Sequence, residues 1–192
     1  MKNTAQGLAA VRESIRAAER KYGRKTGSVR LLAVSKSQPA AAVLEATAAG
    51  QRDFGESYVQ EAIVKIAAVD DPGLCWHFIG PVQSNKTRVI AARFHWVHSV
   101  DRIKVAQRLN DVRAPDLPPL NVCIQVNISA EATKSGVEPG RLPQLAGAVS
   151  ALPRLRLRGL MALPAPTGEF DLQRRSFRAL RELQDDLRRA GL

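Results

Sequence analysis

The segment LNVCIQVNIS, residues 120–129, alternates apolar side chains with polar or small ones, which is typical of a β-strand with two different faces. One face would carry Val122, Ile124, Val126 and Ile128, and the other Asn121, Cys123, Gln125 and Asn127. In a closed barrel both faces are covered, so the apolar row would face a ring of helices. Gln125 and Asn127 would then point inward, toward the carboxyl end of the strand. The alternative is a half-exposed edge strand whose polar row lies in water.

The rest of the chain repeats this kind of unit. Strand-like segments begin near residues 29, 52, 75, 95, 120 and 155, and a segment with helical periodicity follows each of them. Strands that alternate with helices imply a parallel sheet with right-handed crossovers. Short units, repeated six times, favour an α/β fold of the (β/α) TIM-type barrel class over a doubly wound sheet. We expect residues 1–192 to form a single domain.

Local signals predict several element boundaries. An amphipathic helix is expected over residues 4–22, and the first strand over residues 29–35. Pro39 would open the helix that follows this strand, and Gly50 would close it. Ser84 is a candidate N-cap of a later helix, and with its basic neighbours it is also a candidate anion site.

The composition argues against several classes of protein. Although the net charge is +11, the basic residues of segment 154–192 are interleaved with acids and have few aromatic neighbours, so we expect no nucleic-acid partner. No apolar run approaches the ~18 residues of a membrane helix, and the N-terminus does not resemble a secretory signal, so we expect a cytoplasmic protein without membrane contact. Cys75 and Cys123 are expected to be reduced core residues. No metal site is expected, because His95 and His98 would point to opposite faces of a strand.

Lys36 stands at the end of an apolar run, in the segment LLAVSKSQP, residues 31–39. If it points into the mouth of a barrel with Leu32 and Val34 below it, partial desolvation would lower the pKa of its amine. A neutral amine can form a Schiff base with an aldehyde. The alternative is an ammonium group that extends into solvent at the strand end.

Six segments occur in the order and at the spacing of a known family. They are LLAVSKSQP (31–39), GQRDFGESYVQEAIVKI (50–66), WHFIGPVQSNKTR (76–88), VHSVDR (97–102), LNVCIQVNIS with EATKSGV (120–137) and LRLRGLMALPAP (155–166). Together they resemble the pyridoxal phosphate (PLP) homeostasis protein family, the YggS-like proteins. The resemblance implies the barrel of the alanine racemase N-terminal domain without that enzyme's second domain.

The resemblance also implies a function and a set of site residues. Family members hold PLP as a Schiff base on the lysine that corresponds to Lys36, and they act in intracellular PLP and vitamin B6 homeostasis without catalytic turnover. Ser57, His77, Asn127 and Met161 are the further residues expected at the cofactor. Ser57 replaces the asparagine usual in the family, while His77 and Met161 are alternatively ordinary core residues. The family implies a monomer, with PLP-dependent apo-enzymes as possible recipients of PLP.

Other interpretations remain open. Family members continue with two more strands, whose loops cradle the phosphate, whereas this chain ends at Leu192 after six units. We therefore expect weaker PLP binding, a non-binding fragment, or a missing part supplied from elsewhere. A PLP-dependent racemase or decarboxylase is a rival, but it needs a second domain and typically a catalytic tyrosine, and the chain has only Tyr22 and Tyr58. A basic nucleic-acid-binding module is the other rival.

Overall fold

The computed structural model describes residues 4–129 and 135–192. Residues 131–134 of the EATKSGV motif lie outside the described residues. The chain forms two compact units, Met1–Trp76 and His77–Leu192, and each is described by itself. Along the described chain, each of the six strands is followed by an α-helix. The expectation of a single domain stays a prediction.

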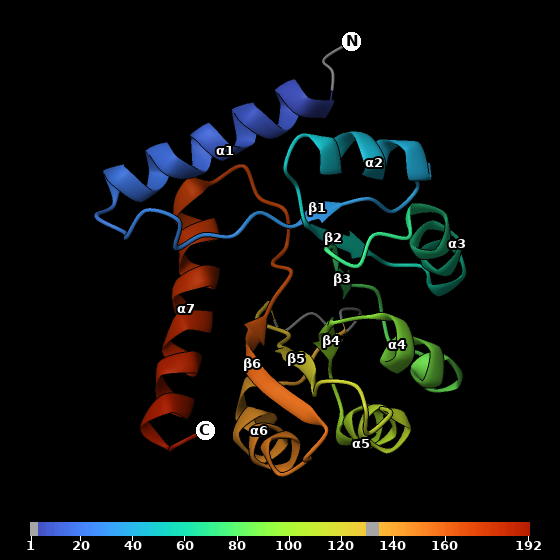
Figure 1. Ribbon diagram of the computed structural model, residues 1–192. Helices are drawn as coiled ribbons and strands as arrows, with labels where there is room; N and C mark the ends of the chain where they lie inside the picture. The colour runs from blue at the N-terminus through green and yellow to red at the C-terminus, as the bar shows by residue number, and fades with distance from the viewer. Residues whose placement is uncertain (1–3, 130–134) are drawn as a thin grey trace. The chain divides into compact units, whose positions relative to one another are not determined.

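The first unit contains three helices and the first two strands. Helix α1 spans Thr4–Lys21, β1 Ala33–Val34, α2 Ala40–Ala48, β2 Asp53–Glu56 and α3 Val59–Val69, and β3 begins at Cys75. Strands β1 and β2 pair in parallel, with Ala33 opposite Phe54 (Figure 1). The Phe54 ring packs 5.7 Å from that of Trp76, and both side chains are buried. This aromatic pair anchors the core of the unit.

The boundaries of α2 confirm the signals in the sequence. Pro39 is the N-cap residue, and the helix begins directly after it, where the missing N–H of proline costs nothing. The helix ends at Ala48, and Gly50 then adopts a left-handed conformation with φ of 80°, which suits glycine.

The first strand is much shorter than the expected range of 29–35. Two backbone groups in residues 29–32 bond side chains instead of a strand partner. The backbone N–H of Val29 donates to the Glu19 carboxylate at 2.8 Å, and the carbonyl of Leu31 accepts from the Gln51 amide at 2.9 Å. Side chains that bond the backbone compete with ladder formation, so the apolar run alone overestimates the strand.

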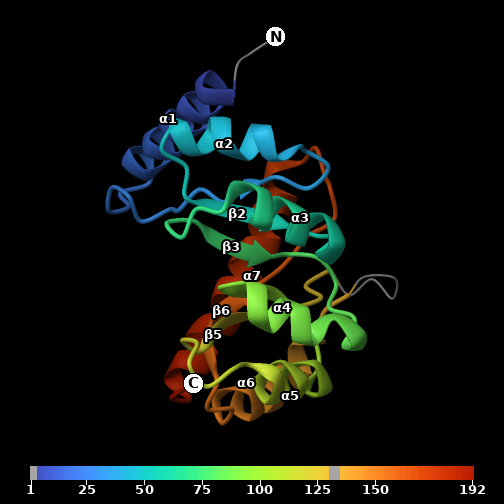
Figure 2. The same ribbon diagram turned by 45° about the vertical axis from the view of Figure 1, so that its right-hand side comes forward.

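The second unit contains the end of β3 and the parallel strands β4 to β6. Strand β3 spans Cys75–Phe78, β4 Trp96–Val100, β5 Leu120–Gln125 and β6 Leu155–Met161. Its helices are α4 (Thr87–Arg93), α5 (Ile103–Val112), α6 (Leu142–Ser150) and α7 (Phe170–Arg189), with 3-10 turns η1 (Ser84–Lys86) and η2 (Pro139–Arg141). Helices α4, α5 and α6 follow one another beside the strands, and α7 packs against β6 (Figures 1 and 2).

Strand β5 confirms the two-faced pattern. It lies between β4 and β6, with Val122 opposite both Val97 and Leu157, so the edge-strand alternative is wrong. Val122 and Ile124 are fully buried, and Cys123 and Gln125 on the other face are also buried. Both faces of the strand are therefore covered.

Strand β5 ends at Gln125, four residues before the expected boundary at residue 129. Val126 instead forms an isolated parallel bridge with Val137, and Val137 N–H donates to the Gln125 carbonyl at 2.8 Å. Gly136 makes this approach possible: its φ is 130°, and a Cβ there would lie 2.6 Å from the backbone nitrogen of Asn127. Beyond Gln125 the returning loop bonds the Gln125 carbonyl and the Asn127 N–H, while the N–H of Val126 still donates to Met161 of β6.

The prediction that Ser84 is an N-cap is wrong. Ser84 lies inside η1, and α4 begins at Thr87 without a side-chain cap. The Thr87 hydroxyl donates to the Ser84 carbonyl at 2.9 Å, so Ser84 contributes its backbone rather than its side chain.

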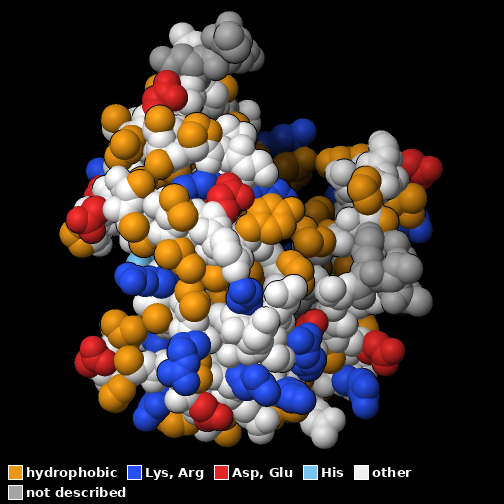
Figure 3. Space-filling model, turned by 90° about the vertical axis from the view of Figure 1, so that its right-hand side faces the viewer, with side chains coloured by type: hydrophobic (Ala, Val, Ile, Leu, Met, Phe, Trp, Pro, Cys, Tyr) orange, Lys and Arg blue, Asp and Glu red, His pale blue; other side chains and the backbone are white. Residues whose placement is uncertain are grey.

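The two cysteines and the charged surface agree with the composition. Both cysteines are free thiols, and burial raises the pKa of each to about 11. On the face shown in Figure 3, lysine and arginine side chains are interspersed with acidic, apolar and uncharged polar ones. Among the described residues, the structure contains no helix with the length and apolar character that crossing a membrane requires.

Candidate functional site

Lys36 lies in a tight turn between β1 and α2, at the carboxyl end of the strand. The N–H of Ser35 still donates to Gly55 of β2 at 2.9 Å, and the N–H of Gln38 then donates back to the Ser35 carbonyl at 3.0 Å. Ser37 has a left-handed φ of 61°, which is costly for a residue with a side chain. The chain thus turns sharply with Lys36 at its bend.

The Lys36 side chain is exposed, and Val34 on the same face of β1 is exposed as well, while Ser35 is buried. The expected partial burial of Lys36 is therefore absent, although its alternation with Ser35 is as predicted. Among the residues that the structure describes, no hydrogen bond or ion pair involves the Lys36 amine. An exposed amine without a partner is accessible to an aldehyde in solution.

Beneath this turn lies a hydrogen-bonded group of residues, which we call the Lys65 network: Ser35, Ser37, Glu56, Glu61 and Lys65. Ser35, Glu56 and Lys65 are buried, Glu61 is half-buried, and the exposed Ser37 contributes its backbone N–H. The Lys65 amine donates to the Ser35 carbonyl at 2.5 Å, to Glu56 Oε1 at 2.7 Å and to Glu61 Oε1 at 2.6 Å. The Ser35 hydroxyl donates to Glu56 Oε1, and the Ser37 N–H donates to Glu61 Oε1, each at 2.6 Å. The network therefore bonds the residues on both sides of Lys36.

The charged groups of the Lys65 network are largely shielded from solvent. The side chain of Glu56 is 0% exposed, that of Lys65 5% and that of Glu61 30%. The pKa of the Glu61 carboxyl is lowered, chiefly by the hydrogen bond from Lys65 and further by the N–H of Ser37. Glu61 therefore accepts both bonds as a carboxylate at neutral pH.

Ser57 is the second expected site residue in this unit. It directly follows β2 and is half-buried, one residue after Glu56 of the Lys65 network. Because β1 and β2 are parallel and paired, Lys36 and Ser57 both lie beyond the carboxyl end of their strands. The structure thus places these two residues at the same edge of the first unit, and their contact with a cofactor stays a prediction.

In the second unit, Asn127 and Met161 lie at the carboxyl ends of neighbouring strands. Met161 is the last residue of β6, and its carbonyl accepts the N–H of Val126 at 2.8 Å. The N–H of Asn127 donates to the Val137 carbonyl at 2.9 Å, and both Asn127 and Met161 are half-buried. Their position matches that expected for residues that contact a ligand at this edge.

His77 differs from the other expected site residues because it is buried within β3. Its Nδ1 lies 2.9 Å from Nε2 of His98, and its ring stacks on that of Trp96 at 5.5 Å. Burial lowers the pKa of His98, which favours a neutral imidazole in this pair. These contacts favour the interpretation of His77 as a satisfied core histidine.

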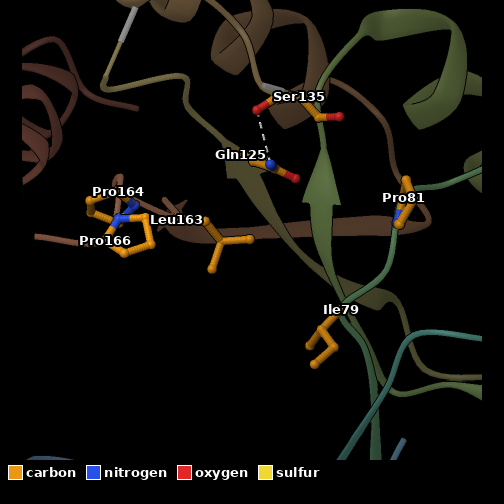
Figure 4. Close-up of a pocket in the computed structure, with 7 residues that line it drawn as sticks. All are labelled: Ile79, Pro81, Gln125, Ser135, Leu163, Pro164 and Pro166. Atoms are coloured by element: carbon orange, nitrogen blue, oxygen red, sulfur yellow. Dashed lines mark hydrogen bonds between the residues drawn. The ribbon is translucent and has the colours of Figure 1, made fainter. Parts of the chain in front are cut away.

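A pocket of about 420 Å³ lies beyond the carboxyl ends of β3, β5 and β6. It is lined by Ile79, Pro81, Gln125, Ser135, Leu163, Pro164 and Pro166. The Gln125 amide donates to the Ser135 carbonyl at 3.0 Å, and apolar side chains line much of the remaining wall (Figure 4). The volume is in the range of small-molecule sites. Alternation along residues 120–129 predicted Gln125 here, whereas the proline-rich segment after β6 was expected only as a loop.

Sequence reasoning missed the Lys65 network. Its one local signal is the spacing of Glu61 and Lys65, which lie four residues apart and share a helix face. The contact with Ser35 joins residues 30 positions apart and appears only in the fold.

The alternation of strands and helices along the chain is consistent with a fragment of a TIM-type barrel. The family model of the alanine racemase N-terminal domain matches residues 7–192. The alanine racemase of Corynebacterium glutamicum has a TM-score of 0.67 at 18% identity, over 96% of this chain and 51% of that one, which supports the fold alone. The chain thus has the fold of the alanine racemase N-terminal domain, as a fragment of a TIM-type barrel.

More similar relatives identify the family. The chain is 60% identical over 187 residues to the pyridoxal phosphate homeostasis protein of Pseudomonas aeruginosa. The match covers 97% of this chain and 81% of that protein. Identity to the Escherichia coli protein of the same name is 55% over 173 residues, or 88% of this chain and 74% of that one. The chain belongs to the pyridoxal phosphate homeostasis protein family.

A solved structure supports the same assignment. PipY of Synechococcus elongatus, in a structure with PLP bound, has a TM-score of 0.77 at 38% identity, and the match covers 92% of this chain and 82% of PipY.

Proposed function

We propose that this protein binds PLP as a Schiff base on Lys36 and acts in intracellular PLP and vitamin B6 homeostasis. The observation that carries the proposal is the exposed Lys36 amine, which has no partner among the described residues and stands at the carboxyl end of β1. Barrel enzymes place their sites at this end of the strands. Membership of the family, and the PLP bound in the PipY structure, support the same cofactor.

The residues around Lys36 fit such a cofactor. Lys36 would hold PLP covalently through its amine, and the cofactor would supply the aldehyde with which that amine condenses, with loss of water. The half-buried Ser57 offers a hydroxyl at the same edge of the first unit. Asn127 and Met161 are proposed as further contacts from the second unit, and His77 is retained as a weaker proposal because its ring is already engaged.

Chemical trapping tests the proposal. Purified protein is mixed with PLP, reduced with borohydride, and mapped by mass spectrometry in parallel with Lys36→Ala. We expect one dominant pyridoxyl adduct on Lys36, which disappears in the variant. Lys25→Ala is the matched control, because Lys25 is exposed in the same unit and carries no proposed role. Labelling spread over many lysines and unchanged by Lys36→Ala would show that the chain is a non-binding fragment.

The proposal includes the absence of catalytic turnover. The relatives are named homeostasis proteins, which fits a carrier rather than an enzyme. Incubation with PLP and single L-amino acids, followed by chiral analysis, is expected to show no sustained racemisation. Turnover that disappears in Lys36→Ala would instead establish a racemase-type enzyme.

The remaining parts of the proposal concern partners and location. We propose a cytoplasmic monomer that delivers PLP to apo-enzymes and binds neither nucleic acid nor membranes. Recovery of activity by a PLP-dependent apo-enzyme, after mixing with the PLP-loaded protein, measures delivery. Light scattering measures the oligomeric state.

A further inference from the structure

The Lys65 network bonds the chain on both sides of Lys36 and leaves Lys36 itself unbonded. On one side, the carbonyl and hydroxyl of Ser35 contact Lys65 and Glu56. On the other side, the N–H of Ser37 contacts Glu61. Two short anchors, one residue before and one residue after Lys36, fix the position of its Cα and the direction in which its side chain leaves the backbone.

The conformation of this turn needs such anchors. Ser37 has a left-handed φ of 61°, although it is not glycine. A residue in this conformation persists where its surroundings hold it there, and strained residues of this kind gather at functional sites. The Glu61 carboxylate receives the N–H of this same residue at 2.6 Å. Loss of that bond would free the turn to relax and would move Lys36.

Lys65 is equipped to hold the turn and poorly equipped to react. An ammonium group has three N–H donors, and Lys65 directs bonds to three separate oxygen atoms at 2.5–2.7 Å. Because its three donors are engaged and its side chain is 5% exposed, an aldehyde in solution has little access to the Lys65 nitrogen. The two lysines of this region therefore differ in role: Lys65 is buried with three acceptors, and Lys36 is exposed and has no partner among the described residues.

We propose that Glu61 and Lys65, with Glu56 beneath them, are positioning residues that orient Lys36 for attack on the aldehyde of PLP. This inference rests on the proposed function, because it explains how the same lysine is presented. The network does not touch the cofactor in this scheme. It acts by holding the peptide units that flank Lys36.

The decisive variants are Glu61→Ala and Glu61→Gln. Glu61 is the most exposed of the three charged residues, so its removal leaves the buried Lys65–Glu56 pair in place. Alanine removes the acceptor for the Ser37 N–H, whereas glutamine keeps an acceptor oxygen on an arm of the same length. Glu45→Ala is the matched control, because Glu45 is an exposed helix glutamate of the same unit whose carboxylate accepts from the Thr4 hydroxyl and does not contact the Lys65 network.

The readout is the rate of adduct formation at Lys36, measured with PLP and separately with pyridoxal. Pyridoxal lacks the phosphate, so a positioning defect will slow both probes by a similar factor. We expect Glu61→Ala to react roughly tenfold to a hundredfold more slowly, in line with the cost of a misplaced reactive group. Glu61→Gln should recover most of that rate, and Glu45→Ala should match the wild type. Circular dichroism at the assay temperature confirms that each variant is folded.

The outcomes separate the two proposals. If the wild-type chain forms no adduct at Lys36, the proposed function fails. If it forms the adduct and folded Glu61→Ala reacts at the same rate, the function stands and the positioning role is overturned. A rate that falls equally in the alanine and glutamine variants also overturns it, because glutamine preserves the anchor. An adduct mapped to Lys65 in the wild-type protein would contradict the assignment of Lys65 as a non-reacting residue.

Discussion

Replacement of Lys65 by methionine would leave a buried carboxylate without its cation. Glu56 is fully buried, and its Oε1 lies 2.7 Å from the Lys65 amine, whose side chain is 5% exposed. Removal of one partner from such a pair costs about 3–5 kcal/mol, because the remaining charge is buried without compensation. The Ser35 carbonyl adds little to this cost, since it keeps the N–H of Gln38 as a donor. We therefore expect the free energy of unfolding to fall by about 3–5 kcal/mol.

Urea unfolding followed by circular dichroism measures this change. Lys25→Met is the control, because Lys25 is exposed and surface substitutions usually change stability by less than about 0.5 kcal/mol. Adding Glu56→Gln to Lys65→Met removes the uncompensated charge, so the double variant should regain a substantial part of the loss. A Lys65→Met protein within about 1 kcal/mol of the wild type would refute the reasoning, since a buried broken pair costs more. A double variant less stable than Lys65→Met would refute it independently.

Three further predictions concern other parts of the chain. The N–H groups of Gly27 and Val29 lower the pKa of Glu19, so its carboxylate stabilises the fold above its unfolded pKa and this contribution is lost as the pH falls through the folded value. The difference in thermal midpoint between wild type and Glu19→Gln should thus be largest near neutral pH and shrink on acidification. Burial raises the pKa of Cys123 from 9.0 to about 11, so its alkylation by iodoacetamide at pH 8 should be roughly a hundredfold slower than that of an ordinary thiol, and unfolding in urea should abolish the difference. Gly136→Ala should lower the free energy of unfolding by about 1–3 kcal/mol, because its φ is 130° and a Cβ would lie 2.6 Å from a backbone nitrogen; Gly140→Ala, where no atom lies within 4 Å, should cost much less.

The sequence predicted the features that depend on alternation and on single residues. The two rows of residues 120–129 identified β5 as a strand buried on both faces, because a period of two assigns each side chain to a face. Pro39 and Gly50 predicted the ends of α2, because each restricts or permits a particular backbone conformation. Lys36 was predicted at the end of β1 because it stands at the end of an apolar run in the sequence.

Features that need several distant segments to meet were not predictable in this way. The Lys65 network joins the end of β1, the end of β2 and the second turn of α3, and periodicity assigns a face without naming its partners. The short length of β1 has a similar cause, because the Glu19 carboxylate takes the N–H of Val29 from ten residues away. Ser84 carried the right residue type for an N-cap, but a 3-10 turn placed it one turn too early.

The saturation of Lys65 has a consequence for chemical selectivity. A reactive aldehyde that enters this part of the first unit meets two primary amines, Lys36 and Lys65, close together in the fold. Their difference in exposure alone would make Lys36 react faster than Lys65. Hydrogen bonding adds a second difference, because the Lys65 amine is held by three acceptor oxygens, whereas the Lys36 amine has no such acceptor among the described residues. A substitution that removes the Glu61 carboxylate would therefore do more than slow adduct formation at Lys36. It would also free one donor of the Lys65 amine, and the adduct would then be divided between the two lysines.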